Sequence, residues 1–258
     1  MINDIATWCE KNFLTLNLEK TQFIQFLTNN KKKKLDVQVK VAVKEIPNTS
    51  DIKFLGLIID IKLKWKKYRN ELNVKLNKAC YALRSVKALV STKTLITIYF
   101  TYFHSLLRYG ITFCGNSPIE KEIFIIQKET IRIIANISRR NSCRLLFNQF
   151  QILTLPCQYI FSILAFVIEN RNLFVLNSDI HDHNTRNVHD IHSFSTHLLI
   201  VQRGVIHSGS KIFNRFPSFI RRQRTLIILR NYLKNYLLEK SFYNLEEYYQ
   251  FSAQETVL

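Results

Sequence analysis

The spacing of the apolar residues changes at Trp65, and this change constrains the fold more than any other feature of the sequence. Before Trp65, apolar residues alternate with polar ones or form short runs rich in β-branched residues, which is typical of strands. After Trp65 they recur every three or four residues, which is typical of helices. The chain has only 5 Gly and 4 Pro, too few for the many tight turns of a sandwich or barrel. We therefore expect an α+β chain that is mainly helical.

Three segments before Trp65 are predicted to form a small antiparallel sheet. The first runs from Thr21 to Thr28, and the second covers residues 37–44, where valines alternate with polar residues. The third is the apolar run Phe54–Ile59, in which a glycine permits a bulge or a close approach of another chain. Lysines at 31–34 predict a solvated hairpin loop, with a phosphate contact as the alternative.

Helices are predicted on both sides of this sheet. A short amphipathic helix from Ile2 to Phe13 precedes it, and a long one follows Trp65. The apolar stripe of the long helix steps by four and three residues, with lysines flanking it. The stripe consists of Tyr68, Leu72, Leu76, Ala79, Leu83, Val86 and Val90. Further helices are predicted over residues 92–109, 117–134, 143–150, 156–170 and 225–238.

Composition and pattern divide the chain into five segments. Residues 1–65 contain the strands, residues 66–115 the basic helices, and residues 116–176 a further helical domain. Residues 177–210 are rich in His, Asn, Ser and Thr, which favours a mobile linker. Residues 211–258 form a C-terminal helical segment.

The charge indicates the kind of partner. The chain carries a net charge of +18, and residues 53–93 hold eleven Lys and Arg against two acidic residues, a net +9. Such a concentration favours nucleic acid, ahead of an acidic membrane. No apolar run reaches the roughly 18 residues of a membrane span, and the N-terminus lacks a signal-peptide pattern. We expect an intracellular protein, in the nucleus or the cytoplasm, with no membrane and no small-molecule substrate.

Residues for catalysis or metal binding are sparse. The five cysteines are widely spaced without Cys-x-x-Cys, which predicts buried thiols in a reducing compartment. His181-Asp182-His183 lacks the cysteines or helical His-x-x-x-His of a zinc site, so the metal interpretation is the weaker one. The 19 acidic residues include no Asp-Asp, and only Asp60 ends an apolar strand. We therefore expect neither a metal ion nor a cofactor.

Short motifs in a fixed order run through nearly the whole chain. In the first part they are Trp8, Asn12–Leu14, Leu16–Thr21, the strand ending at Phe26, Lys53–Asp60 and Trp65. In the later part they are Tyr102–Ile111, Gln127–Lys128, Ile131–Ile134, Ile152–Leu155, His181–Arg186, Gly209–Pro217 and Leu233–Leu238. Together they resemble the C-terminal part of a reverse transcriptase, an RNA-directed DNA polymerase, from jockey-like non-LTR retrotransposons.

The resemblance implies roles for particular residues. Lys20 falls where such polymerases carry a lysine beside the phosphates of the incoming nucleotide. Phe54-Leu55-Gly56 corresponds to the hairpin that grips the primer end, in a palm-edge segment, and the helices after it correspond to a thumb whose lysines follow the duplex backbone. The implied nucleic-acid contacts are Lys53, Phe54, Leu55, Gly56, Lys64, Trp65, Lys67, Lys75 and Lys78.

The family's catalytic Tyr-x-Asp-Asp hairpin would precede the helix that holds Trp8, and the sequence does not contain it. We therefore expect a truncated polymerase that is inactive by itself, because it lacks the carboxylates that hold the catalytic metal ions. Mg²⁺ would be needed only by a complete parent enzyme. Two other hypotheses stay open. The chain could be a co-opted basic module that binds RNA, DNA or protein, or a transposon remnant without a function.

Overall fold

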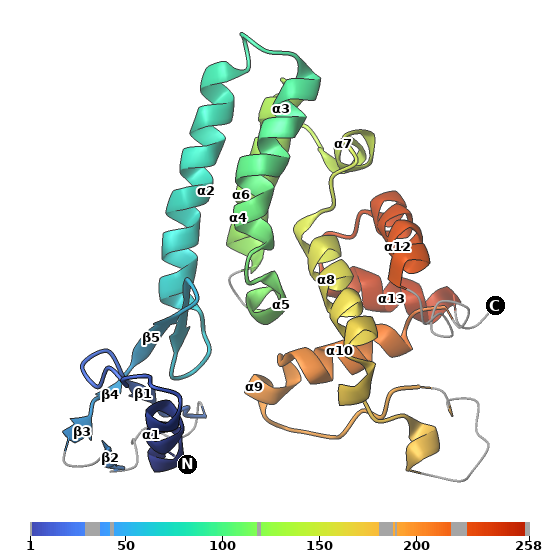
Figure 1. Ribbon diagram of the computed structural model, residues 1–258. Helices are drawn as coiled ribbons and strands as arrows, with labels where there is room; N and C mark the ends of the chain where they lie inside the picture. The colour runs from blue at the N-terminus through green and yellow to red at the C-terminus, as the bar shows by residue number, and fades with distance from the viewer. Residues whose placement is uncertain are drawn as a thin grey trace. The chain divides into compact units, whose positions relative to one another are not determined.

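The computed structural model describes residues 2–28, 37–41, 44–117, 120–180, 188, 190–217 and 226–255. The chain divides into two compact units, Met1–Tyr68 and Arg69–Leu258. The described part is mainly helical with small β-sheets, as predicted (Figure 1). The lysines at 31–34 and His181-Asp182-His183 lie outside the described residues.

The first unit contains α1 (Ile2–Lys11) and six short strands among its described residues. The strands are β1 (Phe23–Ile24), β2 (Val39–Val41), β3 (Lys44–Ile46), β4 (Asn48–Thr49), β5 (Asp51–Phe54) and β6 (Leu57–Asp60). They pair as parallel β1–β4, antiparallel β2–β3 and antiparallel β5–β6. The prediction of one three-stranded antiparallel sheet is therefore wrong. The valine-rich segment does not run on as one strand, because Val41 already pairs with Lys44.

Strands β5 and β6 form a tight hairpin, so the prediction of one strand over Phe54–Ile59 is also wrong. Phe54 pairs with Leu57, and only Leu55 and Gly56 lie between them. Both turn residues have positive φ, 46° and 82°. This is the backbone of a type I′ turn, whose twist matches that of the flanking strands. Gly56 thus lies in a turn, where its freedom at positive φ is required.

Asp60 fixes the loop between the hairpin and the long helix. Its carboxylate accepts the backbone N–H groups of Lys62 (3.0 Å), Lys64 (3.1 Å) and Trp65 (2.6 Å). Leu63 and Trp65 have φ of 48° and 59°, a conformation that costs an L-residue roughly 1–2 kcal/mol. Three hydrogen bonds to one carboxylate offset that strain. The only acidic residue predicted to end an apolar strand therefore has a structural role at the start of α2.

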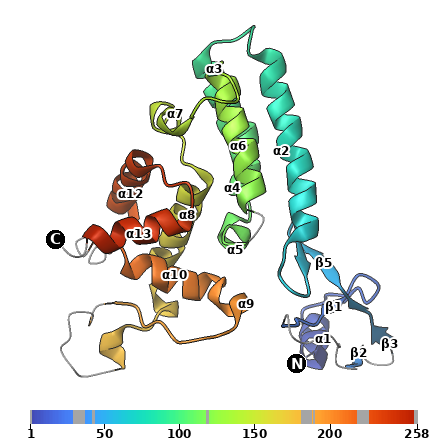
Figure 2. The ribbon, with the colours of Figure 1, turned by 180° about the vertical axis from the view of Figure 1, so that it is seen from behind.

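The long helix α2 (Lys66–Val86) buries the predicted stripe from Tyr68 to Leu83, while Val86 is half-buried and Val90 lies beyond the end of the helix. Leu76 and Leu83 are 0% and 1% exposed, and Tyr68, Leu72 and Ala79 are buried with them. In the second unit α2 runs beside α6 (Glu120–Ile134) in the same direction, because ion pairs join corresponding ends of the two helices. A third, opposed run of helix completes a bundle (Figures 1 and 2).

This third run consists of α3 (Thr92–Ile98), the π-helical turn η1 (Tyr99–His104) and α4 (Ser105–Arg108). Ser91 caps it, since its Oγ accepts the N–H of Thr94 at 3.2 Å. Gly110 ends the run as predicted, with φ of 72°.

The remaining elements of the described residues follow α4 in the chain. They are α5 (Ile111–Cys114), α7 (Arg144–Gln149), α8 (Leu155–Glu169), η2 (Arg171–Leu173), η3 (Asn177–Asp179), α9 (Leu199–Gln202), α10 (Val205–Asn214), α12 (Leu226–Lys240) and α13 (Leu245–Glu255). Helix α8 is central to the core, as its apolar sequence predicts, and packs on α5, α6, α10 and α12. The predicted end of the linker at 210 falls inside α10, whose Ser208, Gly209 and Ser210 are buried.

A fully buried glutamine joins the bundle to α8. Gln127 donates from Nε2 to the Tyr99 hydroxyl and to the Leu153 carbonyl, both at 2.9 Å. Its Oε1 accepts the N–H of Leu155 at 2.8 Å. Because both ends of the amide are satisfied, the buried polar group fixes the relative positions of these elements instead of destabilising the core. No helix of the described residues is long and apolar enough to cross a lipid bilayer.

Candidate nucleic-acid interface

The tip of the β5–β6 hairpin presents apolar side chains to solvent. Phe54 and Leu55 are 58% and 74% exposed, and Gly56 is exposed beside them. Leucine is a poor residue for a left-handed conformation, which asparagine or glycine adopts at lower cost. The exposed Leu55 side chain does not recover that cost by burial. Strained and exposed positions of this kind are candidates for contact with a ligand.

Lysines on α2 form a second candidate surface, in the second unit. Lys75 and Lys78 are exposed, and neither makes an ion pair with any residue that the structure describes. Lys78 lies opposite the buried stripe, with Val74 and Tyr81 at neighbouring positions of the same face. Val74 is 55% exposed and Tyr81 70% exposed. We call these residues, Val74, Lys75, Lys78 and Tyr81, the outer face of α2.

The other predicted contacts differ in how available they are. Lys20, Lys53 and Lys64 are exposed. Lys67 forms an ion pair with Asp51. The hydrogen bond from Lys67 lowers the pKa of the Asp51 carboxyl. The charge of Lys67 is therefore partly compensated within the first unit.

Trp65 is a correction to the predicted contacts. It is only 7% exposed, and its ring packs edge-on against Tyr68 with centroids 6.3 Å apart. A nucleic-acid base cannot stack on an indole that is buried in this way. Trp65 instead anchors the start of α2.

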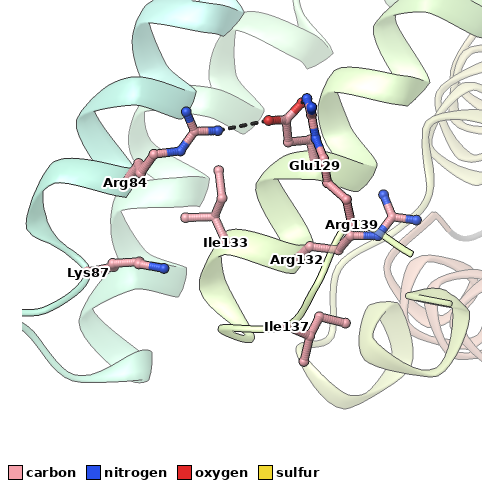
Figure 3. A pocket seen from close by; sticks show the side chains of 7 residues that line it. All are labelled: Arg84, Lys87, Glu129, Arg132, Ile133, Ile137 and Arg139. Atoms are coloured by element: carbon pink, nitrogen blue, oxygen red, sulfur yellow. Dashed lines mark hydrogen bonds and ion pairs between the residues drawn. The ribbon is translucent and has the colours of Figure 1, made fainter. Parts of the chain in front are cut away.

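A basic cleft lies where the C-terminal part of α2 meets α6 and the loop after it (Figure 3). Its volume is about 290 Å³. Four cations and one carboxylate line it above an apolar floor: Arg84, Lys87, Arg132, Arg139 and Glu129, with Ile133 and Ile137. The lining therefore has three positive charges in excess.

Glu129 is the structural centre of this cleft. Its two carboxylate oxygens accept hydrogen bonds from Arg84 and Arg139, each at 2.8 Å. The hydrogen bond and charge of Arg139, followed by the charge of Arg84, hold the pKa of Glu129 below its usual value. Arg132 donates from Nε to the Asn141 carbonyl at 3.0 Å, and Lys87 donates to the Asn136 side chain at 3.0 Å. The side chains are thus oriented, while most of their N–H groups are left for a ligand.

Sequence reasoning missed both Tyr81 and the cleft. Tyr81 could have been found, because it follows Lys78 by three residues on the predicted helix. The cleft depends on bringing Arg84 and Arg139 together at Glu129, which no local spacing reveals.

The structure brings no three His, Cys, Asp or Glu side chains together as metal ligands among its described residues. Cys80, Cys114, Cys143 and Cys157 are buried and unpaired by disulfides. Burial raises the pKa of Cys114 and of Cys157 to about 12, so these thiols are poor nucleophiles.

Comparisons with protein-family models, with curated proteins and with solved structures find no match to this chain. The resemblance to reverse transcriptases therefore rests on the motif series alone.

Proposed function

We propose that this chain binds the backbone of an RNA–DNA duplex as the primer-grip and thumb part of a retrotransposon-type reverse transcriptase. The observation that carries the proposal is the outer face of α2, where Lys75 and Lys78 are exposed and form no ion pair with any described residue. Phosphate groups are recognised by such sequence-indifferent positive surfaces.

The β5–β6 hairpin supports the same proposal. Its turn has the tight geometry that the resemblance implies for a primer grip, and its tip exposes Phe54 and Leu55. Apolar and aromatic side chains at an exposed tip can contact the sugar and base of a strand end. The proposal covers binding without polymerisation, because the Tyr-x-Asp-Asp motif is not in the sequence.

The test is the affinity of the purified chain for a fluorescein-labelled RNA–DNA duplex of about 20 base pairs, measured by anisotropy at several KCl concentrations. Contacts to phosphates release counterions, so the logarithm of the association constant should fall linearly with the logarithm of salt, by about 0.9 for each contact. An affinity that is independent of salt would refute backbone binding. Extension of a primer in Mg²⁺ would refute the proposed lack of catalysis.

A further inference from the structure

The basic cleft is separate from the outer face of α2. Lys75 and Arg84 are nine residues apart, as are Lys78 and Lys87, and nine residues make about two and a half turns of helix. Arg84 therefore lies on the side of α2 away from Lys75 and faces α6, where it meets Glu129 (Figure 3). Lys87 follows the end of α2 and lines the same cleft. A ligand in the cleft would not be held by the outer face.

The cleft holds more positive charges than its one carboxylate can neutralise. One carboxylate would suffice to balance Arg84, and Glu129 instead serves Arg84 and Arg139 together. Arg132 and Lys87 add two more charges whose described partners, Asn141 and Asn136, are neutral. Four cations thus share the lining of the cleft with one carboxylate, and an anion would offset the remaining positive charge.

We propose that this cleft binds neighbouring phosphate groups of one ligand. The planar forks of three arginines match phosphate oxygens in a bidentate manner, and Glu129 and Asn141 hold these forks in place before the ligand arrives. Three excess charges suit a multiply charged anion better than a single carboxylate. The volume of about 290 Å³ is at the small end for ligand sites, which suits a short chain of phosphates.

Two sources supply this chemistry, a polynucleotide strand and a free polyphosphate. Inorganic pyrophosphate is the probe for the site itself, measured by isothermal titration calorimetry of the full chain at 0.15 M KCl. Arg139→Gln is the test variant, because the Arg139 side chain is 79% exposed, and an unchanged thermal unfolding curve is expected for it. Arg140→Gln is the matched control: it removes the same charge from the next residue, which is exposed and does not line the cleft.

The expected result is saturable binding that weakens about tenfold in Arg139→Gln, the loss of one charge-assisted hydrogen bond, and less than twofold in Arg140→Gln. Lys87→Gln, also exposed, should weaken binding with an unchanged thermal unfolding curve. Absence of saturable binding, or equal losses in Arg139→Gln and Arg140→Gln, would overturn the proposal.

A competition assay then assigns the source. Displacement of pyrophosphate by the RNA–DNA duplex assigns the cleft to strand phosphates, and undisturbed binding of both assigns it to a free polyphosphate; either result upholds the site. Because the pyrophosphate titration does not involve Lys75 or Lys78, it stands even if duplex binding by the outer face fails.

Discussion

Replacing Lys75 and Lys78 together with glutamine is the most informative perturbation of the proposed duplex interface. Both side chains are exposed and form no ion pair within the described residues, so glutamine removes charge without leaving a carboxylate unpaired. Glutamine is also a good helix former, so α2 should keep its stability. The effect should appear in binding alone.

The magnitude follows from counterion release. Each phosphate contact contributes about 0.9 to the slope of log affinity against log salt. At 0.1 M KCl one contact is then worth a factor of about 8, and two contacts a factor of roughly 60. The double variant should lose that factor at 0.1 M and show a slope lower by about 1.8.

The assay is anisotropy of the labelled duplex between about 50 and 300 mM KCl, a roughly sixfold range of salt over which screening changes measurably. The matched control is Lys211→Gln with Lys234→Gln, which removes two exposed lysines from α10 and α12. An equal loss in this control would show that affinity follows net charge alone, and an unchanged slope in the test variant would refute contact by the outer face.

Three further predictions concern the hairpin, the loop and a buried carboxyl. Leu55→Asn should stabilise the first unit by about 1 kcal/mol, because Asn-Gly suits the type I′ turn, and should weaken duplex binding by removing the apolar tip. Asp60→Ala should destabilise that unit by about 1–3 kcal/mol through loss of three N–H bonds, as measured by urea unfolding. Burial raises the pKa of Glu120 from 4.5 to about 7. The folded state then holds more protons than the unfolded state between these values, so stability should fall from pH 4.5 to 7, and Glu120→Gln should flatten that dependence.

Each of these has a contrary outcome. Unchanged duplex affinity in Leu55→Asn would remove the hairpin tip from the interface. A stability change below about 0.5 kcal/mol in Asp60→Ala would mean that the loop does not depend on the carboxylate. If the stability of the wild-type chain rises between pH 4.5 and 7, and that of Glu120→Gln rises less, Glu120 itself causes the difference. This result would contradict the burial of the Glu120 carboxyl.

The helical part of the fold was predictable from the sequence because its signal repeats many times. The stripe from Tyr68 to Leu83 offers several turns of consistent spacing, and α8 is apolar along most of its length. Gly110 marks a helix end by its freedom at positive φ. Each of these signals lies within a few turns of the chain, and burial of every residue of a stripe favours the same helix.

The small sheets were predicted poorly for a physical reason. Their strands have two to four residues, too few for an alternating pattern to fix the register. The turn at Leu55-Gly56 carries leucine where asparagine is the usual signal, so the apolar run was interpreted as one strand. Only the family resemblance indicated a hairpin there.

The candidate interface was predicted in part. Charge density indicated α2, and its exposed lysines lie where the helical period places them. Trp65 was among the predicted nucleic-acid contacts but is buried, because the loop held by Asp60 turns its indole toward Tyr68. The cleft could not be predicted, since Glu129 and Arg139 meet only after the chain turns back beyond α6.

Cross-linking tests the central claim most directly. A duplex with 4-thiouridine in the RNA strand and 4-thiothymidine in the DNA strand would be bound to the full chain, irradiated, and the linked peptides identified by mass spectrometry. We expect links in the peptides that contain Phe54 at the hairpin tip and Tyr81 on the outer face of α2. Links confined to α7 through α13, with none at either position, would contradict the proposed interface.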